Sequence, residues 1–452
     1  MKSINPTTNE VIREYREHTS DEVDVIVDSV HKEWKSWRET TFEYRARLFR
    51  NAAKILRSDK ERYARLMTSE MGKIIRESIA EIEKCANACD FFADHAEGML
   101  KEQEIASDAS RSIVVFQPLG VILAVMPWNF PFWQLFRFAA PSMMAGNAAV
   151  MKHASNVPGC ALAIEEVFRL AGFPENIFRN LMIPSSGVER VIANPRIAAT
   201  TLTGSELAGS QVASAAAKHI KKSVLELGGS DAFVVLDDAD MDLTIGVAMI
   251  ARMLNQGQSC IAAKRFIVVE KVVDDFTERL SRAIQSLKIG DPNDQDTQIG
   301  PLARVDLVDE IDRQVQSSAG QGAKIIAGGK RPDREGCYYL PTILSGVRKG
   351  MDVYHQETFG PVFSIIPVKD EQEALVVAND SEFGLGGSVF TKDVRRGEAF
   401  ARKVETGAMF VNSLTKSDPR LPFGGIKKSG FGRELAEFGI REFVNIKTIW
   451  IR

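Results

Sequence analysis

The chain has 452 residues, of which 44% are hydrophobic and 26% are charged. A chain of this length exceeds what one ordinary core requires, so we expect two large domains or one elaborated α/β unit. The formal net charge of -3, from 57 basic and 60 acidic residues, gives no general attraction for nucleic acid or an anionic membrane and favours a small-molecule partner.

The sequence contains no segment that looks like a secretory signal or a membrane span. Residues 1–10 have no apolar centre followed by small residues, and the longest apolar runs, at 121–126 and 139–151, fall short of the roughly twenty residues that a span needs. The five cysteines are odd in number and scattered, which argues against a disulfide framework and for reduced thiols. We therefore expect a cytoplasmic protein in which one thiol is available to react.

Residues 20–105 are predicted to form helices, because apolar residues recur there at spacings of three and four. Two sets show this pattern: Val23, Ile26, Val27 and Val30, and then Leu48, Ala52, Ile55 and Leu56. Cys85 and Cys89 share one side of a helix in this region. Because no histidine or second cysteine pair has zinc spacing, we expect these two thiols to pack and no metal to bind.

After residue 120 the pattern changes to short apolar runs separated by helical segments of about ten to fifteen residues, which is typical of βαβ units. A first, Rossmann-like sheet is predicted from strands at Val121–Met126, Ala148–Lys152, Phe178–Met182, Ala198–Leu202 and Val224–Leu227. A second α/β domain is predicted from strands at Phe233–Leu236, Phe266–Val269, Ile325–Ala327, Phe363–Pro367, Ser388–Phe390 and Met409–Asn412. The segments Arg111–Phe116 and Phe443–Ile451 also alternate like strands.

Three residues carry chemistry that becomes informative in combination. Cys260 follows glycine and polar residues where a helix gives way to a strand, a position suited to exposure in a cleft, although a lone cysteine is more often a buried hydrophobe. Glu226 lies between leucines, where lost hydration raises a pKa and suits a proton acceptor; the alternative is a salt-bridged strand end. Asn129 lies between two prolines that fix its amide, which suits an oxyanion donor; the alternative is a turn asparagine.

Five segments together resemble the aldehyde dehydrogenase superfamily, in the right order over essentially the whole chain. They are Pro127–Pro131 (PWNFP), Leu225–Gly229 (LELGG), Gly257–Cys260 (GQSC), Glu357–Pro361 (ETFGP) and Pro422–Gly425 (PFGG). The short N-terminal region and the segment Lys427–Glu434 (KKSGFGRE) make the resemblance greatest to the compact bacterial succinate-semialdehyde dehydrogenases.

The resemblance implies an aldehyde dehydrogenase fold: a Rossmann-like cofactor domain, a second α/β catalytic domain and a small β oligomerisation element. The expected parts are an NAD(P)-binding domain at 1–228, with 105–120 contributing oligomerisation strands, a catalytic domain at 229–425, and a C-terminal return and oligomerisation tail at 426–452. We expect a homodimer or homotetramer, because the two outlying strand segments offer edges for pairing.

The resemblance also assigns catalytic roles. Cys260 would be the nucleophile that attacks the aldehyde carbon, and Asn129 with the backbone N–H of Cys260 would hold the oxyanion. Glu226 would help to deprotonate the thiol and would later activate the water that hydrolyses the thioester.

Cofactor binding is expected without the usual glycine fingerprint after the first strand. Instead Gly204 and Ser205 open a helix after the fourth strand, where a helix N-terminus favours a pyrophosphate. The other residues matched to cofactor contacts are Trp128, Lys152, Leu227, Glu357 and Phe359. Ser155 stands where many NAD-specific relatives have a glutamate that would repel a 2′-phosphate. We therefore expect NADP to be accepted, with NAD as an alternative.

The substrate is predicted from Arg137, eight residues after Asn129 on a helix that in the family lines the substrate tunnel. An arginine there offers bidentate capture of a carboxylate, as in succinate-semialdehyde dehydrogenases; the alternative is an arginine paired with an acid on the helix surface. Gln134 and Ser417 are further candidates for substrate contact. A second arginine that some semialdehyde enzymes place six residues before the cysteine is Leu254 here.

Other functions stay open at this point. The enzyme could instead act on glutarate semialdehyde or a simple aliphatic aldehyde, or form a coenzyme A thioester, although Glu226 favours hydrolysis. A non-catalytic structural member of the family is less favoured, because Cys260, Glu226 and Asn129 are all present.

Overall fold

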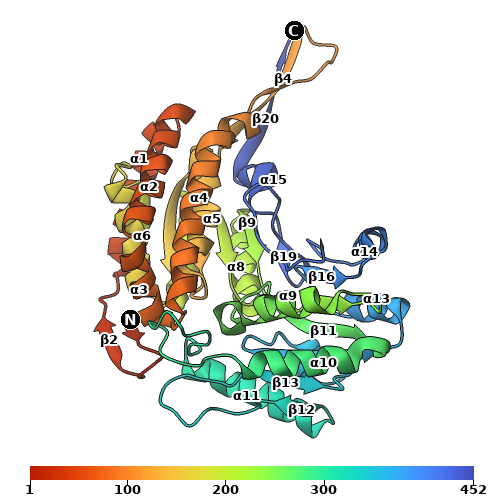
Figure 1. Cartoon of the computed structure of the whole chain (residues 1–452). Helices are drawn as coiled ribbons and strands as arrows, with labels where there is room; N and C mark the ends of the chain where they lie inside the picture. Colours follow the sequence, from red (N-terminus) through yellow and green to blue (C-terminus); the bar gives the residue numbers. More distant parts are fainter.

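The computed structural model describes residues 1–452 and contains two mainly parallel sheets, each flanked by helices (Figure 1). The chain begins with a hairpin of β1 (Lys2–Ile4) and β2 (Val11–Glu14), which the sequence analysis did not predict. Its loop reaches the second sheet's domain, where the backbone N–H of Cys337 donates to the carbonyl of Pro6 at 2.8 Å. The hairpin therefore ties the start of the chain to a distant part of it.

The predicted N-terminal helical region is confirmed. Four helices follow the hairpin: α1 (Ser20–Trp37), α2 (Phe42–Ser58), α3 (Lys60–Met71) and α4 (Ile75–Met99). Thr19 begins α1 with a capping box, because its hydroxyl accepts from the N–H of Glu22 while the Glu22 carboxylate accepts from the N–H of Thr19. The apolar positions that predicted α1 and α2 are mostly buried against the first sheet's core.

The first sheet contains all five predicted strands. They are β5 (Val121–Met126), β6 (Ala148–His153), β7 (Phe178–Asn180), β8 (Ile197–Thr203) and β9 (Lys222–Glu226). The sheet order is β19-β9-β8-β5-β6-β7, with β5 to β9 parallel and the unpredicted β19 (Gly430–Phe431) antiparallel at the edge. The connecting helices are α5 (Pro131–Met144), α6 (Pro158–Leu170), α7 (Val188–Ala193) and α8 (Glu206–Lys218).

The second sheet has the order β12-β13-β14-β11-β10-β16-β17. Its predicted strands are confirmed as β10 (Asp231–Val235), β11 (Ala263–Val269), β12 (Lys324–Ala327), β14 (Val362–Val368), β16 (Gly387–Phe390) and β17 (Phe410–Val411). The buried strand β13 (Thr342–Ser345) was not predicted from the sequence. Its helices are α9 (Met241–Met253), α10 (Glu270–Gln285), α11 (Val305–Gly320), α12 (Asp352–His355), α13 (Glu371–Asn379) and α14 (Val394–Ala401).

Strand alternation divides the core of the second sheet between its two faces. In β10 the residues Ala232 and Val234 belong to one apolar cluster, whereas Phe233 and Val235 belong to another. The first sheet packs in a larger cluster that also takes in Phe423 and Leu435 from the end of the chain. The C-terminal region therefore returns from the second sheet to the first.

The chain that returns to the first sheet forms only short elements. They are β15 (Phe383–Gly384), β18 (Ile426–Lys427), β19 and α15 (Ala436–Ile440). Gly430 and Phe431 of β19 pair with Glu226 and Leu225 of β9. The expected domain boundary at residues 228 and 229 falls between β9 and β10, and the division into domains stays a prediction.

The third sheet extends away from the body of the molecule (Figure 1). It consists of β3 (Gln103–Glu104), β4 (Arg111–Pro118) and β20 (Val444–Ile451), in the order β20-β4-β3. Both outlying segments predicted as strands are strands, and they pair antiparallel with each other from Val444 opposite Pro118 to Ile451 opposite Arg111. No helix of the chain has both the length and the apolar character that crossing a bilayer requires.

Candidate active site

A hollow opens between the carboxyl ends of the first sheet's strands and the loop that carries Cys260. Such an edge is where ligands bind in open α/β sheets, because several strand ends and helix starts converge there. Ten of the predicted site residues line it: Trp128, Asn129, Gln134, Lys152, Gly204, Ser205, Leu227, Cys260, Glu357 and Phe359. Glu226, Arg137, Ser155 and Ser417 do not line this hollow.

A tight turn after α9 presents Cys260. Asn255 and Gln256 have φ of 52° and 53°, and Gly257 has φ of 77°. A Cβ on Gly257 would lie 2.3 Å from the carbonyl oxygen of Gly360, so this close approach admits only glycine. The turn brings the chain sharply from the end of α9 to the cysteine.

Hydrogen bonds from three other elements hold the turn. The N–H of Asn255 donates to the carboxylate of Glu77 on α4 at 2.7 Å, and the Asn255 amide donates to the carbonyl of Asn129 at 2.7 Å. The ammonium of Lys264 donates to the carbonyl of Cys260 at 2.7 Å. The turn that carries the thiol is therefore held by one nearby lysine and by contacts with two segments far away in the sequence, at Glu77 and Asn129.

Asn129 lies beside the same turn. Its Nδ2 donates to the carbonyl of Gln258 at 3.1 Å, and its Oδ1 has no hydrogen-bond partner although it is buried. A side-chain amide carries two N–H donors, so the second remains available to a ligand in the hollow.

Cys260 is partly exposed, whereas the other four cysteines are buried. Burial raises the pKa of its thiol to about 12, an effect that the charges of Arg137 and Lys264 oppose. The thiol is therefore protonated at neutral pH, and its use as a nucleophile requires a base.

Glu226 ends β9 beneath the hollow, with 2% of its surface exposed. Both carboxylate oxygens lack a hydrogen-bond partner. Burial raises the pKa of this carboxyl well above its usual value; the charge of Arg137 opposes that shift and that of Glu434 adds to it. A Cβ on Gly424 would lie 2.6 Å from Oε1 of Glu226, so the glycine leaves the space that the carboxylate occupies.

The wall of the hollow combines aromatic rings with a fixed carboxylate. The rings of Trp128 and Phe359 meet edge to face with centroids 5.8 Å apart. The carboxylate of Glu357 accepts from the N–H of Gly229 at 3.0 Å and pairs with the ammonium of Lys264 at 3.2 Å.

A second hollow adjoins the first and shares Lys152, Ser185 and Leu202 with it. The ammonium of Lys152 donates to the hydroxyl of Ser185 at 3.4 Å. Burial lowers the pKa of Lys152. Ser205 caps α8 by accepting from the N–H of Ala208. The two hollows thus form one elongated groove along a lysine, several hydroxyls and a helix N-terminus, a donor set that fits a dinucleotide. Ser155 is exposed on the turn after β6.

Arg137 is buried on α5 and is held from three sides. It forms an ion pair with the carboxylate of Glu434, its guanidinium lies 4.6 Å from the ring centroid of Phe423, and it donates to the hydroxyl of Thr203 at 3.2 Å. The alternative to substrate binding was an ion pair with an acid on the helix surface. The pairing acid is instead a buried residue that the chain's return supplies, and the substrate role of Arg137 stays a prediction.

Ser417 contacts a residue that the sequence analysis did not single out. The ammonium of Lys84 on α4 donates to its hydroxyl at 2.7 Å. A lysine in a helix is ordinarily a surface charge, and the neighbouring Glu83 and Cys85 give no local signal that Lys84 lies inward.

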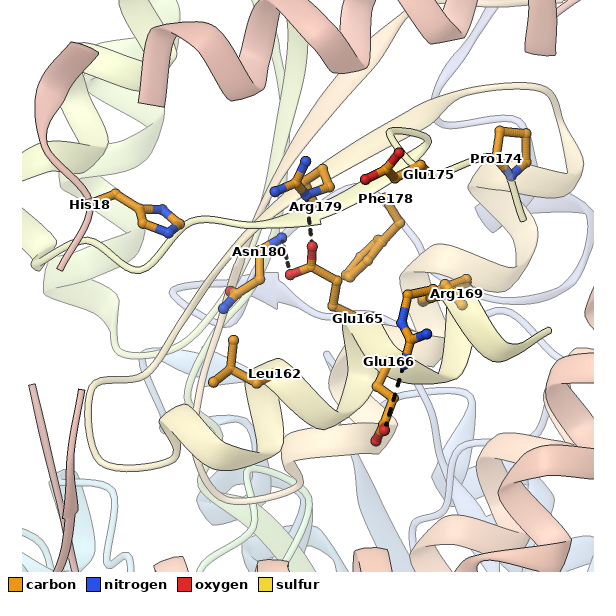
Figure 2. A pocket seen from close by; sticks show the side chains of 11 residues that line it. His18, Leu162, Glu165, Glu166, Arg169, Pro174, Glu175, Phe178, Arg179 and Asn180 are labelled. Carbon is orange, nitrogen blue, oxygen red and sulfur yellow. Dashed lines mark hydrogen bonds and ion pairs between the residues drawn. The ribbon is translucent and has the colours of Figure 1, made fainter. Parts of the chain in front are cut away.

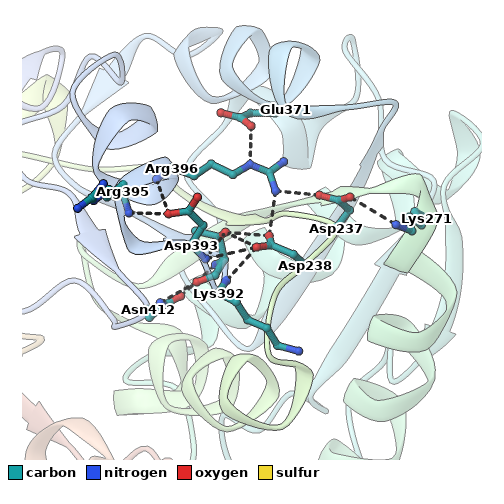
Figure 3. Close-up of polar contacts among 10 residues, drawn as sticks. Asp237, Asp238, Lys271, Glu371, Lys392, Asp393, Arg395, Arg396 and Asn412 are labelled. Atoms are coloured by element: carbon teal, nitrogen blue, oxygen red, sulfur yellow. Dashed lines mark hydrogen bonds and ion pairs between the residues drawn. The ribbon is translucent and has the colours of Figure 1, made fainter.

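In two other charged clusters, the arginines pair with carboxylates of the same cluster. Figure 2 shows a hollow near α6 in which Arg179 donates to Glu165 at 2.7 Å and Arg169 pairs with Glu166. Figure 3 shows a network at the end of β10, where Arg396 pairs with Asp237 and Asp238 at 3.0 Å and with Glu371 at 2.7 Å. No group of histidine, cysteine and carboxylate side chains is arranged to hold a metal ion.

Comparisons with known proteins match the chain over its full length. The sequence model described as the Aldehyde dehydrogenase family matches residues 1–449. A Synechocystis protein named a probable succinate-semialdehyde dehydrogenase, NADP(+), is 52% identical over 100% of this chain and 99% of the relative. The Escherichia coli succinate semialdehyde dehydrogenase, NAD(P)+, Sad is 45% identical over 99% and 97% of the two chains. The structure of succinic semialdehyde dehydrogenase from Streptococcus pyogenes in complex with NADP+ is 41% identical and superposes with a TM-score of 0.98, covering 100% of this chain and 99% of that chain.

Proposed function

Because the chain belongs to the aldehyde dehydrogenase family, we propose that it oxidises succinate semialdehyde to succinate, with NADP as oxidant and NAD as an alternative. The observation that carries the proposal is the grouping of a partly exposed Cys260, the Asn129 amide and the unpartnered carboxylate of Glu226. The names of the relatives at 52% and 45% identity support this substrate.

Cys260 is the nucleophile in this scheme. Its sulfur bonds to the aldehyde carbon while the carbonyl electron pair moves to oxygen, giving a thiohemiacetal. Since burial keeps the thiol protonated, a base must take its proton, and the raised pKa of Glu226 suits that task. The free N–H of the Asn129 amide and the backbone N–H of Cys260 are the donors we assign to the oxyanion.

The second half of the reaction hydrolyses a thioester. Bound NADP supplies the acceptor for the hydride of the thiohemiacetal carbon, and the acyl group remains on Cys260. Glu226 then takes a proton from water as the water oxygen attacks the acyl carbon, and the sulfur leaves with the electron pair of the carbon–sulfur bond. The released acid is succinate. A base placed for water argues against transfer of the acyl group to coenzyme A.

The elongated groove fits the oxidant. We assign Lys152 to the adenosine ribose, Gly204 and Ser205 at the start of α8 to the pyrophosphate, and Glu357 to the nicotinamide ribose. Trp128, Leu227 and Phe359 supply the apolar part of the wall. Ser155 brings no negative charge to the turn after β6, so a 2′-phosphate meets no repulsion from that side chain.

The substrate's far end is assigned to the α5 side of the hollow. Gln134 lines the hollow, and its side-chain amide NH2 is the group that could donate to a carboxylate. Arg137 and Ser417 bring a cation and a hydroxyl to the same region. Glutarate semialdehyde and simple aliphatic aldehydes are the competing substrates.

Two further proposals concern the cell and the assembly. All five cysteines are free, including Cys85 and Cys89 on one helix, which suits the reducing cytoplasm. The edge strand β20 exposes Ile446 and Trp450, and we propose that it pairs with a second copy of this chain to give a homodimer or homotetramer.

The test replaces the nucleophile. We expect Cys260→Ala to abolish reduction of NADP with succinate semialdehyde, while Cys337→Ala, a thiol outside the site, keeps it. A mass spectrum of the acid-quenched wild type should show the four-carbon acyl adduct on Cys260. An adduct on another residue, or activity retained in Cys260→Ala, would refute the scheme. Rates for succinate semialdehyde, glutarate semialdehyde and butanal, each with NADP and NAD, decide the preferred pair.

A further inference from the structure

Lys84 is a partly buried cation without an acidic partner. Other cations around the site are neutralised: Lys73 pairs with Glu81, Arg137 with Glu434 and Lys264 with Glu357. Lys84 forms no ion pair, and its one hydrogen bond goes to the neutral hydroxyl of Ser417. Lys152 also lacks an acidic partner, but it lies on the cofactor side of the groove, so Lys84 is the unpaired cation on the α5 side.

The surroundings of Lys84 make an unpaired charge costly. Its ammonium lies 4.1 Å from the ring centroid of Trp133. Burial, together with the nearby charge of Arg137, lowers the pKa of Lys84 to about 8. An anion bound between the ammonium and the Ser417 hydroxyl would relieve that cost with charge-assisted hydrogen bonds.

The helix that carries Lys84 also touches the nucleophile's turn. Glu77 and Lys84 are seven residues apart, which places them on one face of α4 about 10 Å apart along its axis. Glu77 accepts from the N–H of Asn255, five residues before Cys260. Between them, Glu81 accepts from the N–H of Phe132 and of Trp133 at the start of α5.

The start of α5 connects Lys84 to the hollow. Trp133, over which the ammonium lies, directly precedes Gln134, and Gln134 lines the hollow together with Cys260. Arg137 lies one turn after Trp133 on α5, which places both side chains on one face of that helix.

We propose that Lys84, assisted by Ser417, binds the terminal carboxylate of an aldehyde whose carbonyl end reacts at Cys260. This rests on the proposed function and makes Lys84 the residue that selects acidic over neutral aldehydes. Arg137 supplies a second cation to the same region, but Glu434 already pairs with it, so the unpaired ammonium of Lys84 adds the charge that a carboxylate requires.

The test compares two aldehydes of equal chain length, succinate semialdehyde and butanal. We expect Lys84→Met to lower kcat/KM for succinate semialdehyde by about 30-fold, mainly through KM, and to change that for butanal by less than about twofold. Retained butanal oxidation also shows that the variant is folded. Lys84→Arg should recover part of the loss, and Lys54→Met, which removes an exposed lysine of α2, should change neither substrate.

A second measurement uses carboxylic acids as inhibitors, with butanal as the substrate. Succinate should inhibit butanal oxidation by the wild type more strongly than butanoate does, and Lys84→Met should abolish that difference. Suppose the wild type prefers succinate semialdehyde. If Lys84→Met keeps that preference, or loses activity on both aldehydes equally, the role of Lys84 is overturned while the proposed function stands. A wild type that oxidises butanal but not succinate semialdehyde would overturn the proposed function.

Discussion

A carboxyl group without a hydrogen-bond partner, buried at the end of a strand, sets the pH behaviour expected of this site. Burial favours the neutral form of Glu226, so its pKa lies well above the usual carboxyl value. Below that pKa the group holds a proton and cannot accept one from water; above it the carboxylate is present. Hydrolysis of the thioester should therefore accelerate as pH rises through the raised pKa and then level off.

Glu226→Gln tests this expectation, because the amide keeps the shape and cannot act as a base. We expect kcat to fall by about 100-fold or more and to lose the rise with pH that depends on this group, and acylation of Cys260 in the first turnover to slow as well, because the same carboxylate takes the thiol proton. Stopped-flow measurement of the burst and the steady state across a pH series separates the two steps. Glu437→Gln, an exposed counterpart on α15, should match the wild type. An unchanged steady-state profile in Glu226→Gln would exclude the group as the base for water.

Single residues also show what the sequence could and could not predict. Cys260 and Asn129 lie in short local motifs, and the structure brings both to one hollow as expected. The pairing of Arg137 with Glu434 joins positions almost 300 residues apart, and no local pattern encodes such a contact. Lys84 was missed for the related reason that only the tertiary structure removes it from water.

At the scale of elements, the long helix α4 supplies the cap for the N-terminus of α5. The carboxylate of Glu81 accepts from the N–H of Phe132 and of Trp133, both at 2.9 Å, and so supplies an N-terminal cap from another helix. It also pairs with Lys73, whose ammonium is fully buried over the ring of Phe130. One side chain thus satisfies two backbone donors and one buried charge.

We predict that Glu81→Ala lowers the free energy of unfolding by about 3 kcal/mol, because it leaves Lys73 as an unpaired buried cation. Glu83→Ala removes a carboxylate from the same helix that pairs with Lys60 near the surface, and should cost less than about 1 kcal/mol. Urea denaturation followed by tryptophan fluorescence gives both values. Equal losses of unfolding free energy in the two variants would show that the buried pair contributes no more to stability than the surface pair.

Elements were predictable where the sequence carries a run of apolar residues. Strand β5 is a continuous run buried in a parallel sheet, whereas β6 ends in Lys152 and His153 and β8 includes three threonines. Length alone does not decide the outcome, because β12 and β16 with four residues and β17 with two were predicted, whereas β13 with four and β19 with two were not. β19 exists because the returning chain is held against β9, which is a tertiary effect.

At the scale of the whole molecule, one edge of the third sheet has no neighbouring strand. Strand β20 is an unpaired edge, and it exposes 62% of Ile446 and 51% of Trp450 on the same side of the strand. An edge of this kind is normally covered, and a second copy of the chain offers an equivalent strand.

Replacing both residues, as Ile446→Lys with Trp450→Lys, should convert the assembly to monomers, because two ammonium groups would be forced into an apolar contact. Light scattering on a sizing column measures the mass directly. The paired replacement Lys2→Met with Lys54→Met, away from this sheet, should leave the mass unchanged. A wild type that already runs as a monomer would contradict the proposed pairing.

The returning C-terminal segment has a consequence for the order in which the protein is made. By the time residue 410 leaves the ribosome, the chain already carries Cys260 and the residues assigned to the cofactor groove. It still lacks Gly424, which leaves room for the Glu226 carboxylate, and Glu434, the counter-ion of Arg137. We therefore expect a nascent chain to stay inert toward aldehydes until its last segment has docked, which protects an unfinished thiol from being acylated with no means of release.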